Sequence, residues 1–240
     1  MTPDGWRPVL NYLKSQGVEK INIAGGEPFL YPDLNDLCML LKTMGFKTSI
    51  VSNGSRITEQ KLDEIHPYLD WLGLSIDSPD ERDEISIGRC AAGINHLENI
   101  KNVAEIAHRY GIKIKLNITA VRKSIDKDFR SFIESVAAER VKVFRALTLK
   151  GANDDVQDTW SVSDEEFESF REKHASMPGI VFEDNSDMIG SYLMFDPLGR
   201  WMVNKGGEKR FLPFESLIRN GMESELETSK YYARNAIYDW

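Results

Sequence analysis

The stretch KINIAGGEPFLYPD, residues 20–33, decides the fold. It begins as a short strand with Ile21 and Ile23 on one face and Lys20 and Asn22 on the other, because successive side chains of a strand alternate. The strand runs directly into two glycines, an acid and a proline. Glycines let the backbone approach a ligand closely. We therefore expect a ligand site at the mouth of a barrel, directly after this strand.

Composition narrows the classes of function. The chain has 240 residues, enough for one large α/β domain or two small ones, and 41% of them are hydrophobic. The formal net charge is −8 and the sequence pI is about 5.2. This balance argues against a binder of nucleic acid or anionic membrane, whose surface would be basic. An anionic ligand must instead meet a local cluster of cations.

The chain shows no targeting or disulfide signal. Its first residues, MTPDGWRPVL, have neither a basic start nor an apolar core, and no apolar run is long enough to span a bilayer. We therefore expect a cytoplasmic protein. Cys38 and Cys90 form no disulfide framework or metal motif. The histidines have no metal-ligand spacing; they are His66, His96, His108 and His174.

Short β-branched runs alternate with amphipathic stretches along the chain, which is typical of parallel βαβ units. A helix is expected first, and strands are expected at 20–24, 48–54, 71–77, 113–119 and 141–147. This rhythm predicts an α/β fold, a partial (βα)6 TIM-type barrel that lacks its first strand and the loop after it. A flat doubly wound sheet is the rival. We expect the barrel to occupy residues 1–185, and residues 186–240 to form a C-terminal extension or lid.

Alternation within the strands places cations on the faces that point into the barrel. These residues are Lys20, Lys115, Arg140 and Lys142. An ordinary barrel interior is packed with branched apolar residues, and burying an unpaired charge costs several kcal/mol. The pattern thus favours a multivalent anion such as a polyphosphate. The alternative is that these cations extend to water at strand ends or pair with acidic residues.

The order of several motifs identifies a family. KINIAGGEPFL (20–30), SIVSNGS (49–55), LSIDS (74–78), IGR (87–89) and NHLENI (95–100) resemble the radical S-adenosylmethionine (SAM) enzymes, and within them viperin and its prokaryotic relatives. The resemblance continues through VKVF, SDEEFESF, SYLMFD and the terminal DW, so it covers nearly the whole chain. GGEP alone would suggest only the superfamily, but its order and spacing with the other motifs are much more specific.

The resemblance implies roles for individual residues. The SAM site is implied at Gly25, Gly26, Glu27, Pro28, Asn53, Ser75 and Arg89. The nucleoside triphosphate site is implied at Lys20, Lys115, Asn117, Arg140, Lys142 and Lys209. Tyr192 matches a tyrosine beside the nucleotide sugar, a candidate catalytic hydrogen or proton donor. A core aromatic residue is the alternative reading of Tyr192.

The resemblance also implies an activity. In such enzymes a reduced 4Fe–4S cluster, supplied with electrons by a reductase or flavodoxin-type donor, cleaves SAM to a 5′-deoxyadenosyl radical. The radical takes the 4′ hydrogen of a ribonucleoside triphosphate, and loss of water gives a 3′-deoxy-3′,4′-didehydro nucleotide with an antiviral role. The tail with Asp239 and Trp240 is expected to close over the site. The resemblance does not choose among cytidine, uridine and guanosine triphosphates.

One expected motif is missing from these residues. The superfamily holds its cluster with three cysteines at CxxxCxxC spacing, which this sequence does not contain. Cys38 lies on the apolar stripe of a helix and Cys90 in an expected loop, so neither replaces the motif. We expect an N-terminally truncated copy of the enzyme. The alternative is a catalytically inactive protein that retains nucleotide or SAM binding without a cluster.

Overall fold

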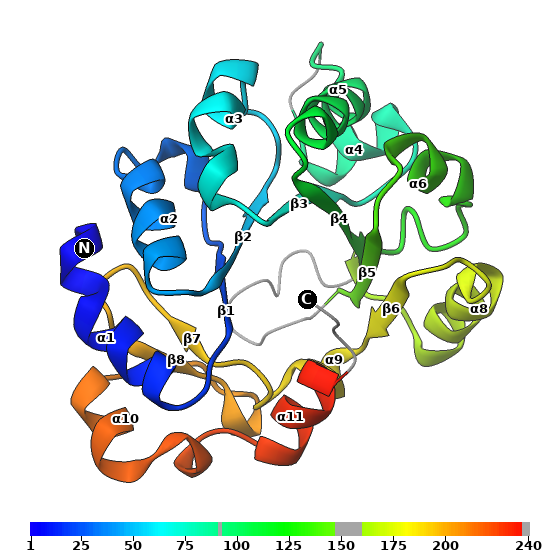
Figure 1. Cartoon of the computed structure of the whole chain (residues 1–240). Coiled ribbons are helices and arrows are strands. Elements are labelled where there is room, and N and C mark those ends of the chain that lie inside the picture. The colour runs from blue at the N-terminus through cyan, green and yellow to red at the C-terminus, as the bar shows by residue number, and fades with distance from the viewer. Residues whose placement is uncertain (91–92, 147–159, 237–240) are drawn as a thin grey trace. The chain divides into compact units, whose positions relative to one another are not determined.

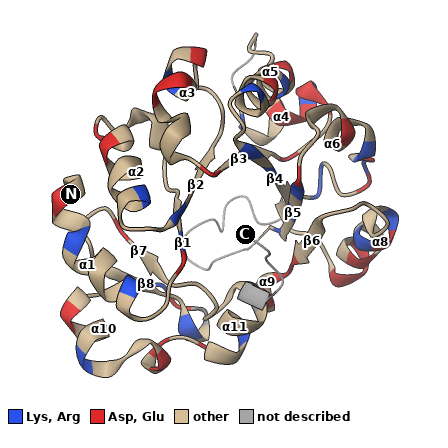
Figure 2. Cartoon of the chain, viewed as in Figure 1, with Lys and Arg blue, Asp and Glu red and all other residues tan. Residues whose placement is uncertain are grey.

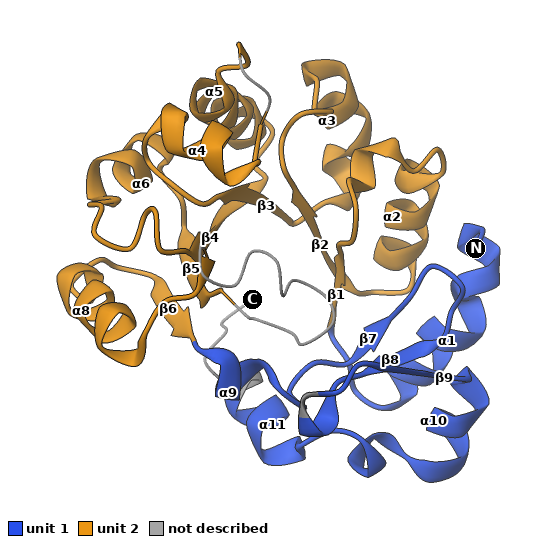
Figure 3. Cartoon of the chain, turned by 180° about the vertical axis from the view of Figure 1, so that it is seen from behind, with its two compact units in different colours: residues 1–19, 184–240 blue, residues 20–183 orange. Residues whose placement is uncertain are grey.

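The structure, a computed structural model, describes residues 1–90, 93–146 and 160–236 (Figure 1). The chain divides into two compact units (Figure 3). Residues 20–183 form one unit, and residues 1–19 together with 184–240 form the other. The expected division at residue 185 into a barrel and a C-terminal lid stays a prediction.

The larger unit is built on a six-stranded sheet in which every neighbouring pair of strands is parallel. The strand order follows the chain order. The strands are β1 (Lys20–Ile23), β2 (Lys47–Ser52), β3 (Trp71–Ile76), β4 (Lys113–Ala120), β5 (Arg140–Arg145) and β6 (Ile180–Glu183). A doubly wound sheet would reverse its strand order at a switch point. This sequential order therefore supports the partial barrel and excludes the rival.

Helices follow the strands and lie on the outside of the curved sheet (Figure 1). They are α2 (Leu34–Thr43), α3 (Glu59–Ile65), α4 (Glu81–Ile87), α5 (His96–Arg109), α6 (Arg130–Val136) and α8 (Asp164–His174), with short 3-10 turns at η1 (Pro28–Leu30) and η2 (His66–Tyr68). Local sequence starts two of these helices. The Asn95 side chain accepts from the Glu98 amide at α5, and Ser163 forms a reciprocal capping box with Glu166 at α8.

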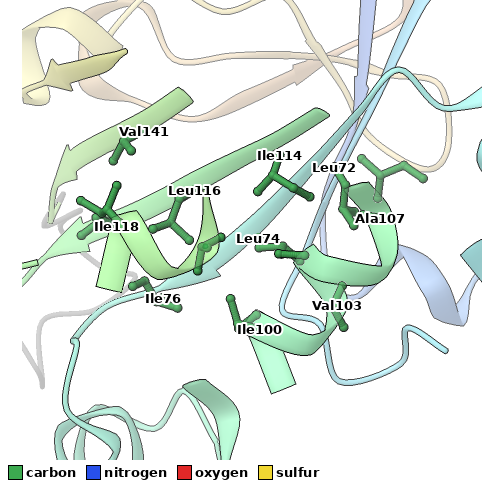
Figure 4. Close-up of a cluster of buried hydrophobic side chains, with 14 of the residues drawn as sticks. Leu72, Leu74, Ile76, Ile100, Val103, Ala107, Ile114, Leu116, Ile118 and Val141 are labelled. Carbon is green, nitrogen blue, oxygen red and sulfur yellow. The ribbon is translucent and has the colours of Figure 1, made fainter. Parts of the chain in front are cut away.

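The outer face of the sheet carries the core of this unit (Figure 4). Alternate residues of β3 and β4, such as Leu72 and Ile114, pack against Ile100, Val103 and Ala107 of α5, and all five are at most 3% exposed. Each fully buried side chain of this size contributes about 1.5–3 kcal/mol. Because this face is buried against the helices, the side chains on the other face of every strand point away from the helices.

The smaller unit has its own hydrophobic cluster. It contains α1 (Pro3–Ser15), α9 (Asn185–Met188), β7 (Met194–Phe195), β8 (Trp201–Val203), η4 (Lys205–Gly207), β9 (Arg210–Leu212), α10 (Phe214–Asn220), η5 (Met222–Ser224) and α11 (Thr228–Ala236). Strands β7, β8 and β9 form an antiparallel sheet. Trp201 and Leu217 are fully buried, and the Tyr12 ring contacts the Phe214 ring edge-on with centroids 5.7 Å apart. The first helix of the chain therefore packs with residues near its end.

Within residues 1–90, 93–146 and 160–236, no helix has the length and apolar character needed to cross a bilayer.

Candidate functional site

The inner face of the sheet collects polar and cationic side chains from neighbouring strands. Residues that pair across parallel strands point to the same face. Lys115 of β4 pairs with Arg140 of β5, and Asn117 pairs with both Ser75 of β3 and Lys142. Figure 2 shows Lys and Arg on the ribbons of β1, β4 and β5. The register thus places the predicted cations of β4 and β5 side by side, opposite the face that packs on the helices.

Lys20 of β1 belongs to the same group of cations. Burial and the positive charges of Lys115, Arg140 and Lys142 lower the pKa of Lys20 to about 6, although Asp70 acts in the opposite direction. Burial is the largest cause of this shift, and the neighbouring positive charges add to it. A multiply charged anion bound here would offset part of the repulsion between these cations.

Lys142 has a close carboxylate partner. Its amine lies 2.6 Å from Oε1 of Glu183 on β6, and both side chains are at most 8% exposed. The alternative expectation, pairing with an acidic residue, therefore holds for Lys142. The periodicity of the sequence does not predict β6, and Glu183 could therefore not be predicted as the partner of Lys142.

Glu27 connects the GGEP segment to the loop after β2. Its Oε1 accepts from the Phe29 amide at 3.2 Å and from the Ser52 hydroxyl at 2.7 Å, and its Oε2 accepts from the Asn53 amide at 3.0 Å. A carboxylate offers about four lone-pair sites, so these three bonds leave room for one further donor. The predicted residues Glu27 and Asn53 are thus brought together by a direct hydrogen bond.

Gly25 and Gly26 lie at the exposed end of β1. Gly25 has φ +114°, and a Cβ added at either glycine would meet no atom of the described residues within 4 Å. The backbone there is open, and Pro28 directly after it is buried at the start of η1. An ammonium group could therefore approach both the glycine carbonyls and the remaining acceptor position of Glu27. This arrangement fits the amino group of SAM.

Arg89 is oriented by Asp77 at the end of β3. The Arg89 Nε donates to Asp77 Oδ2 at 3.0 Å, and Asp77 Oδ1 accepts from the Thr119 amide at 3.2 Å. Gly88 precedes Arg89 and has φ +88°, a left-handed conformation that ends α4 and turns the chain toward β3. Arg89 is therefore a partly buried, paired cation rather than a solvated surface charge.

A buried Glu84–His96 pair supports this end of β3. Glu84 Oε1 accepts from the amides of Asp77 and Ser78 at 2.7 and 2.5 Å, and its Oε2 lies 3.3 Å from His96 Nε2. His96 Nε2 also lies 3.1 Å from the Ser75 carbonyl oxygen, which can only accept, so Nε2 carries the proton. Burial chiefly raises the pKa of Glu84 to about 7 and lowers the pKa of His96. The pair fixes the backbone that presents Ser75 and Asp77.

We expect Glu84→Ala to lower the free energy of unfolding by about 1–3 kcal/mol for each backbone amide that loses its acceptor. Glu84→Gln keeps an oxygen acceptor and should lose much less. Urea unfolding of both variants measures the difference, with Glu105→Gln on the exposed face of α5 as the control. Equal stabilities of the alanine and glutamine variants would contradict the assignment.

The same pair has a pH signature. Between pH 4.5 and about 7 the folded state keeps a proton on Glu84 that the unfolded state releases. The contribution of the Glu84 carboxyl to the free energy of unfolding is therefore lost as the pH rises from 4.5 to about 7. His96 gives the opposite slope near its ordinary pKa because its folded pKa is lowered. The free energy of unfolding is measured against pH for the unmodified chain and for Glu84→Gln. The difference between the two curves is the contribution of the Glu84 carboxyl.

Two predicted site residues lie in the smaller unit. Tyr192 is half-buried, and Lys209 is exposed with its amine 5.4 Å from the centre of the Phe211 ring. Their roles stay predictions. Asp239 and Trp240, expected in the lid, lie outside the described residues.

The two cysteines do not suit an iron–sulfur cluster. Cys38 is fully buried in α2, where burial raises the pKa of its thiol to about 12. Cys90 donates to Glu81 at 3.4 Å, and burial followed by the Glu81 carboxylate raises its pKa to about 11. Cluster ligands are thiolates, and both environments oppose ionisation. Among the described residues, no three His, Cys, Asp or Glu side chains gather as a metal site.

Several residues of the site were missed at the level of sequence. Glu183 lies on an unpredicted strand, and Glu84 lies in the acidic run DERDE, which is typical of a solvated surface. His96 was noticed without a role. Trp71 could have been assigned to the inner face from the alternation of side chains, because it lies on the same face as Ser75 in the strand WLGLSID.

Two solved structures have a similar fold. SuiB of Streptococcus suis bound to S-adenosylmethionine matches with a TM-score of 0.58 at 18% identity, over 77% of this chain and 44% of that one. A domain of pyruvate-formate lyase-activating enzyme from Bacteroides vulgatus matches with a TM-score of 0.52 at 16% identity. The match covers 69% of this chain and 99% of that domain. At these identities the likeness establishes the fold, and it confirms the predicted partial barrel.

Sequence relatives are more informative. An S-adenosylmethionine-dependent nucleotide dehydratase of a Thermoplasmatales archaeon is 61% identical over 240 residues, which is all of this chain and 86% of that protein. The protein of that name from Oncorhynchus mykiss, RSAD2, is 33% identical over 96% of this chain and 70% of its own length. A relative from Lacinutrix mariniflava is 35% identical, and this chain spans 50% of it.

The Radical SAM superfamily profile matches residues 1–136. This match covers more than half of the chain, and the relatives above are similar over nearly all of it. The chain therefore belongs to the radical SAM superfamily and, within it, to the family of S-adenosylmethionine-dependent nucleotide dehydratases.

Proposed function

We propose that this chain binds a ribonucleoside triphosphate at the cations of its inner sheet face and serves its SAM-dependent dehydration to the 3′-deoxy-3′,4′-didehydro form. The observation that carries the proposal is the register of β4 and β5, which places Lys115, Arg140 and Lys142 on one face of the sheet. Burial, followed by the positive charges of these three residues, lowers the pKa of Lys20 to about 6. A triphosphate is a multiply charged anion that several such cations can bind together. The names of the relatives support a nucleotide substrate, and an antiviral role follows by family resemblance.

In this proposal the loops at the ends of β1, β2 and β3 hold SAM. The glycines and Glu27 accept from its ammonium group, and Asn53, Ser75 and Arg89 contact its ribose and carboxylate. SAM supplies the 5′-deoxyadenosyl group that takes the substrate hydrogen. Support comes from the open backbone at Gly25 and Gly26 and from the fourth acceptor position of Glu27.

The proposal extends to the smaller unit and to a partner. Lys209 and Tyr192 carry the roles that the resemblance implies, a phosphate contact for Lys209 and a hydrogen or proton donor for Tyr192. A reductase or flavodoxin-type protein would supply electrons in the cytoplasm. These elements rest on the resemblance alone.

One observation favours a second candidate, a nucleotide- or SAM-binding protein without redox chemistry. Burial raises the thiol pKa of both Cys38 and Cys90, and neither suits cluster ligation. Anaerobic reconstitution followed by iron and sulfide analysis separates the two candidates for these 240 residues. Both candidates require measurable binding of a nucleoside triphosphate, and a yield of less than one cluster equivalent per chain would favour the second. A stoichiometric 4Fe–4S cluster would contradict the second candidate, and absence of triphosphate binding would contradict both.

A further inference from the structure

The segment NHLEN, residues 95–99, begins α5, and two of its side chains hold backbone carbonyl groups of other segments. His96 Nε2 donates to the Ser75 carbonyl oxygen at 3.1 Å, near the end of β3. Asn99 Nδ2 donates to the Gly54 carbonyl oxygen at 3.1 Å, in the loop after β2. A carbonyl oxygen can only accept, so the amide nitrogen of Asn99 faces it. The start of α5 therefore holds the chain at the carboxyl ends of both β2 and β3.

The loop after β2 and helix α5 approach each other closely at Gly54. A Cβ atom at residue 54 would lie 3.0 Å from Cδ1 of Ile100 and 3.1 Å from Nδ2 of Asn99, and both distances are shorter than a normal van der Waals contact. Ile100 is fully buried in the core of the larger unit (Figure 4), where close packing leaves it little room to move. A side chain at residue 54 would therefore displace the Asn99 amide.

The bond from Asn99 continues through Gly54 and Ser52 to Glu27. The Gly54 amide donates to Ser52 Oγ at 2.9 Å, and the Ser52 hydroxyl donates to Glu27 Oε1 at 2.7 Å. Hydrogen bonds in series polarise and strengthen one another. Ser52 is only 2% exposed, so a displaced hydroxyl would not find water in place of its partners. The position of Gly54 thus affects the Glu27 carboxylate.

Two of the three donors to Glu27 among the described residues lie in the loop that Asn99 holds. These donors are the Ser52 hydroxyl and the Asn53 amide, whereas the third, the Phe29 amide, belongs to the same segment as Glu27. The orientation of the carboxylate relative to β2 therefore depends on this loop. Asn53 precedes Gly54 directly, so both residues that the SAM site shares with this loop contact are one or two bonds from the Asn99 tether.

We propose that Asn99 is a positioning residue of the SAM site, which fixes the loop after β2 so that Glu27 and Asn53 meet SAM in the correct orientation. This inference rests on the proposed function for the identity of the ligand. It assigns Asn99 no contact with SAM. It gives a role to the NHLENI segment, which the resemblance includes without assigning it one.

The decisive substitution is Asn99→Asp, which keeps the size of the side chain and replaces the amide donor with an acceptor. A carboxylate would repel the Gly54 carbonyl oxygen. A negative charge near the start of a helix is favourable, so the melting temperature should change little. Asn102→Asp, at an exposed position of the same helix, is the matched control. Asn99→Ala removes the donor without adding a charge, and it decides the test if the aspartate variant does not fold.

Amide hydrogen exchange of the full chain tests the tether without any ligand. We expect the amides of Asn53 and Gly54 to exchange about tenfold faster in Asn99→Asp, because the bonds that protect them are loosened. Exchange in β4 should stay as in the unmodified chain, and Asn102→Asp should leave all of these rates unchanged. Unchanged exchange at Asn53 and Gly54 in Asn99→Asp would overturn the inference, whatever the chain binds.

Calorimetry with SAM and with a nucleoside triphosphate tests the consequence for binding. We expect Asn99→Asp to weaken SAM about tenfold and to leave the triphosphate unchanged, because the cations of β4 and β5 do not lie in this loop. If the unmodified chain binds no SAM, the proposed SAM site fails. If it binds SAM and Asn99→Asp binds it equally well, the SAM site stands and the role of Asn99 fails. Equal losses for both ligands together with a lower melting temperature would show a general structural role instead.

Discussion

Lys142→Ala should lower the free energy of unfolding by about 3–5 kcal/mol, the largest stability effect that we expect from a single substitution in this chain. The cause is Glu183. Its carboxylate lies 2.6 Å from the lysine amine, and the two side chains are 8% and 6% exposed. Removing the amine leaves a buried carboxylate without its cation. Urea unfolding followed by circular dichroism measures the loss.

A second variant separates the ion pair from the rest of the site. The double substitution Lys142→Met with Glu183→Gln removes both charges and keeps similar volumes, so it should recover most of the stability. Lys123→Met, at an exposed position, is the control and should change the free energy of unfolding by less than about 0.5 kcal/mol. A loss below 1 kcal/mol for Lys142→Ala would show that the pair is not buried as described.

The double variant also tests the substrate role of Lys142. Because it should fold, its affinity for a nucleoside triphosphate can be compared directly with that of the unmodified chain. Loss of a charge-assisted hydrogen bond should weaken binding by about 1–3 kcal/mol. Unchanged affinity would remove Lys142 from the proposed triphosphate site and leave it a structural residue.

Affinity for a nucleoside triphosphate should fall about tenfold for each pH unit between pH 7.5 and 9, because one proton is taken up on binding. Lys20 has a pKa of about 6 in the free chain and is neutral in this range. Bound phosphate stabilises the ammonium form and raises the pKa. Phosphate monoesters are already fully ionised above pH 7.5, so the ligand contributes little to the slope. Calorimetry in buffers of different ionisation enthalpy counts the proton.

The surroundings of Lys20 define the control. Lys115, Arg140 and Lys142 face it with positive charge, Asp70 acts with negative charge, and the Trp71 ring lies beneath it without net charge. Lys20→Arg keeps a cation at every pH and should remove the slope while preserving affinity at pH 9. A slope that persists in Lys20→Arg would assign the proton to another group. No slope in the unmodified chain would mean that Lys20 does not meet the anion.

Much of this site could be predicted because the alternation of side chains between the two faces of a strand can be read from the sequence of that strand alone. Alternation in KIKLNIT and VKVF placed Lys115 and Lys142 on one face, and the register of β4 and β5 brings Asn117 and Lys142 together. The GGEP and SNGS motifs were expected in one site, and the bond between Glu27 and the Asn53 amide joins them.

What could not be predicted depends on partners distant in the sequence. Strand β6 has four residues and no alternation of polarity, so nothing local distinguishes it from a loop. Glu84 is surrounded by charged neighbours in sequence, and only the turn of α4 toward β3 carries it into the interior. Whether an acidic residue pairs with a buried amide or amine depends on contacts that form only in the folded chain. The sequence around that residue does not predict them.

The order of the strands also determines when the anion site comes into being during synthesis. Each strand of the larger unit pairs with the one made just before it, so the sheet can grow by successive addition as the chain leaves the ribosome. Lys20 emerges first, whereas Arg140 and Lys142 emerge only with β5. A nascent chain that ends before residue 140 thus carries a sheet without the residues that concentrate positive charge. Under the proposed function, the chain therefore acquires its full set of nucleotide-binding cations only once β5 has been made.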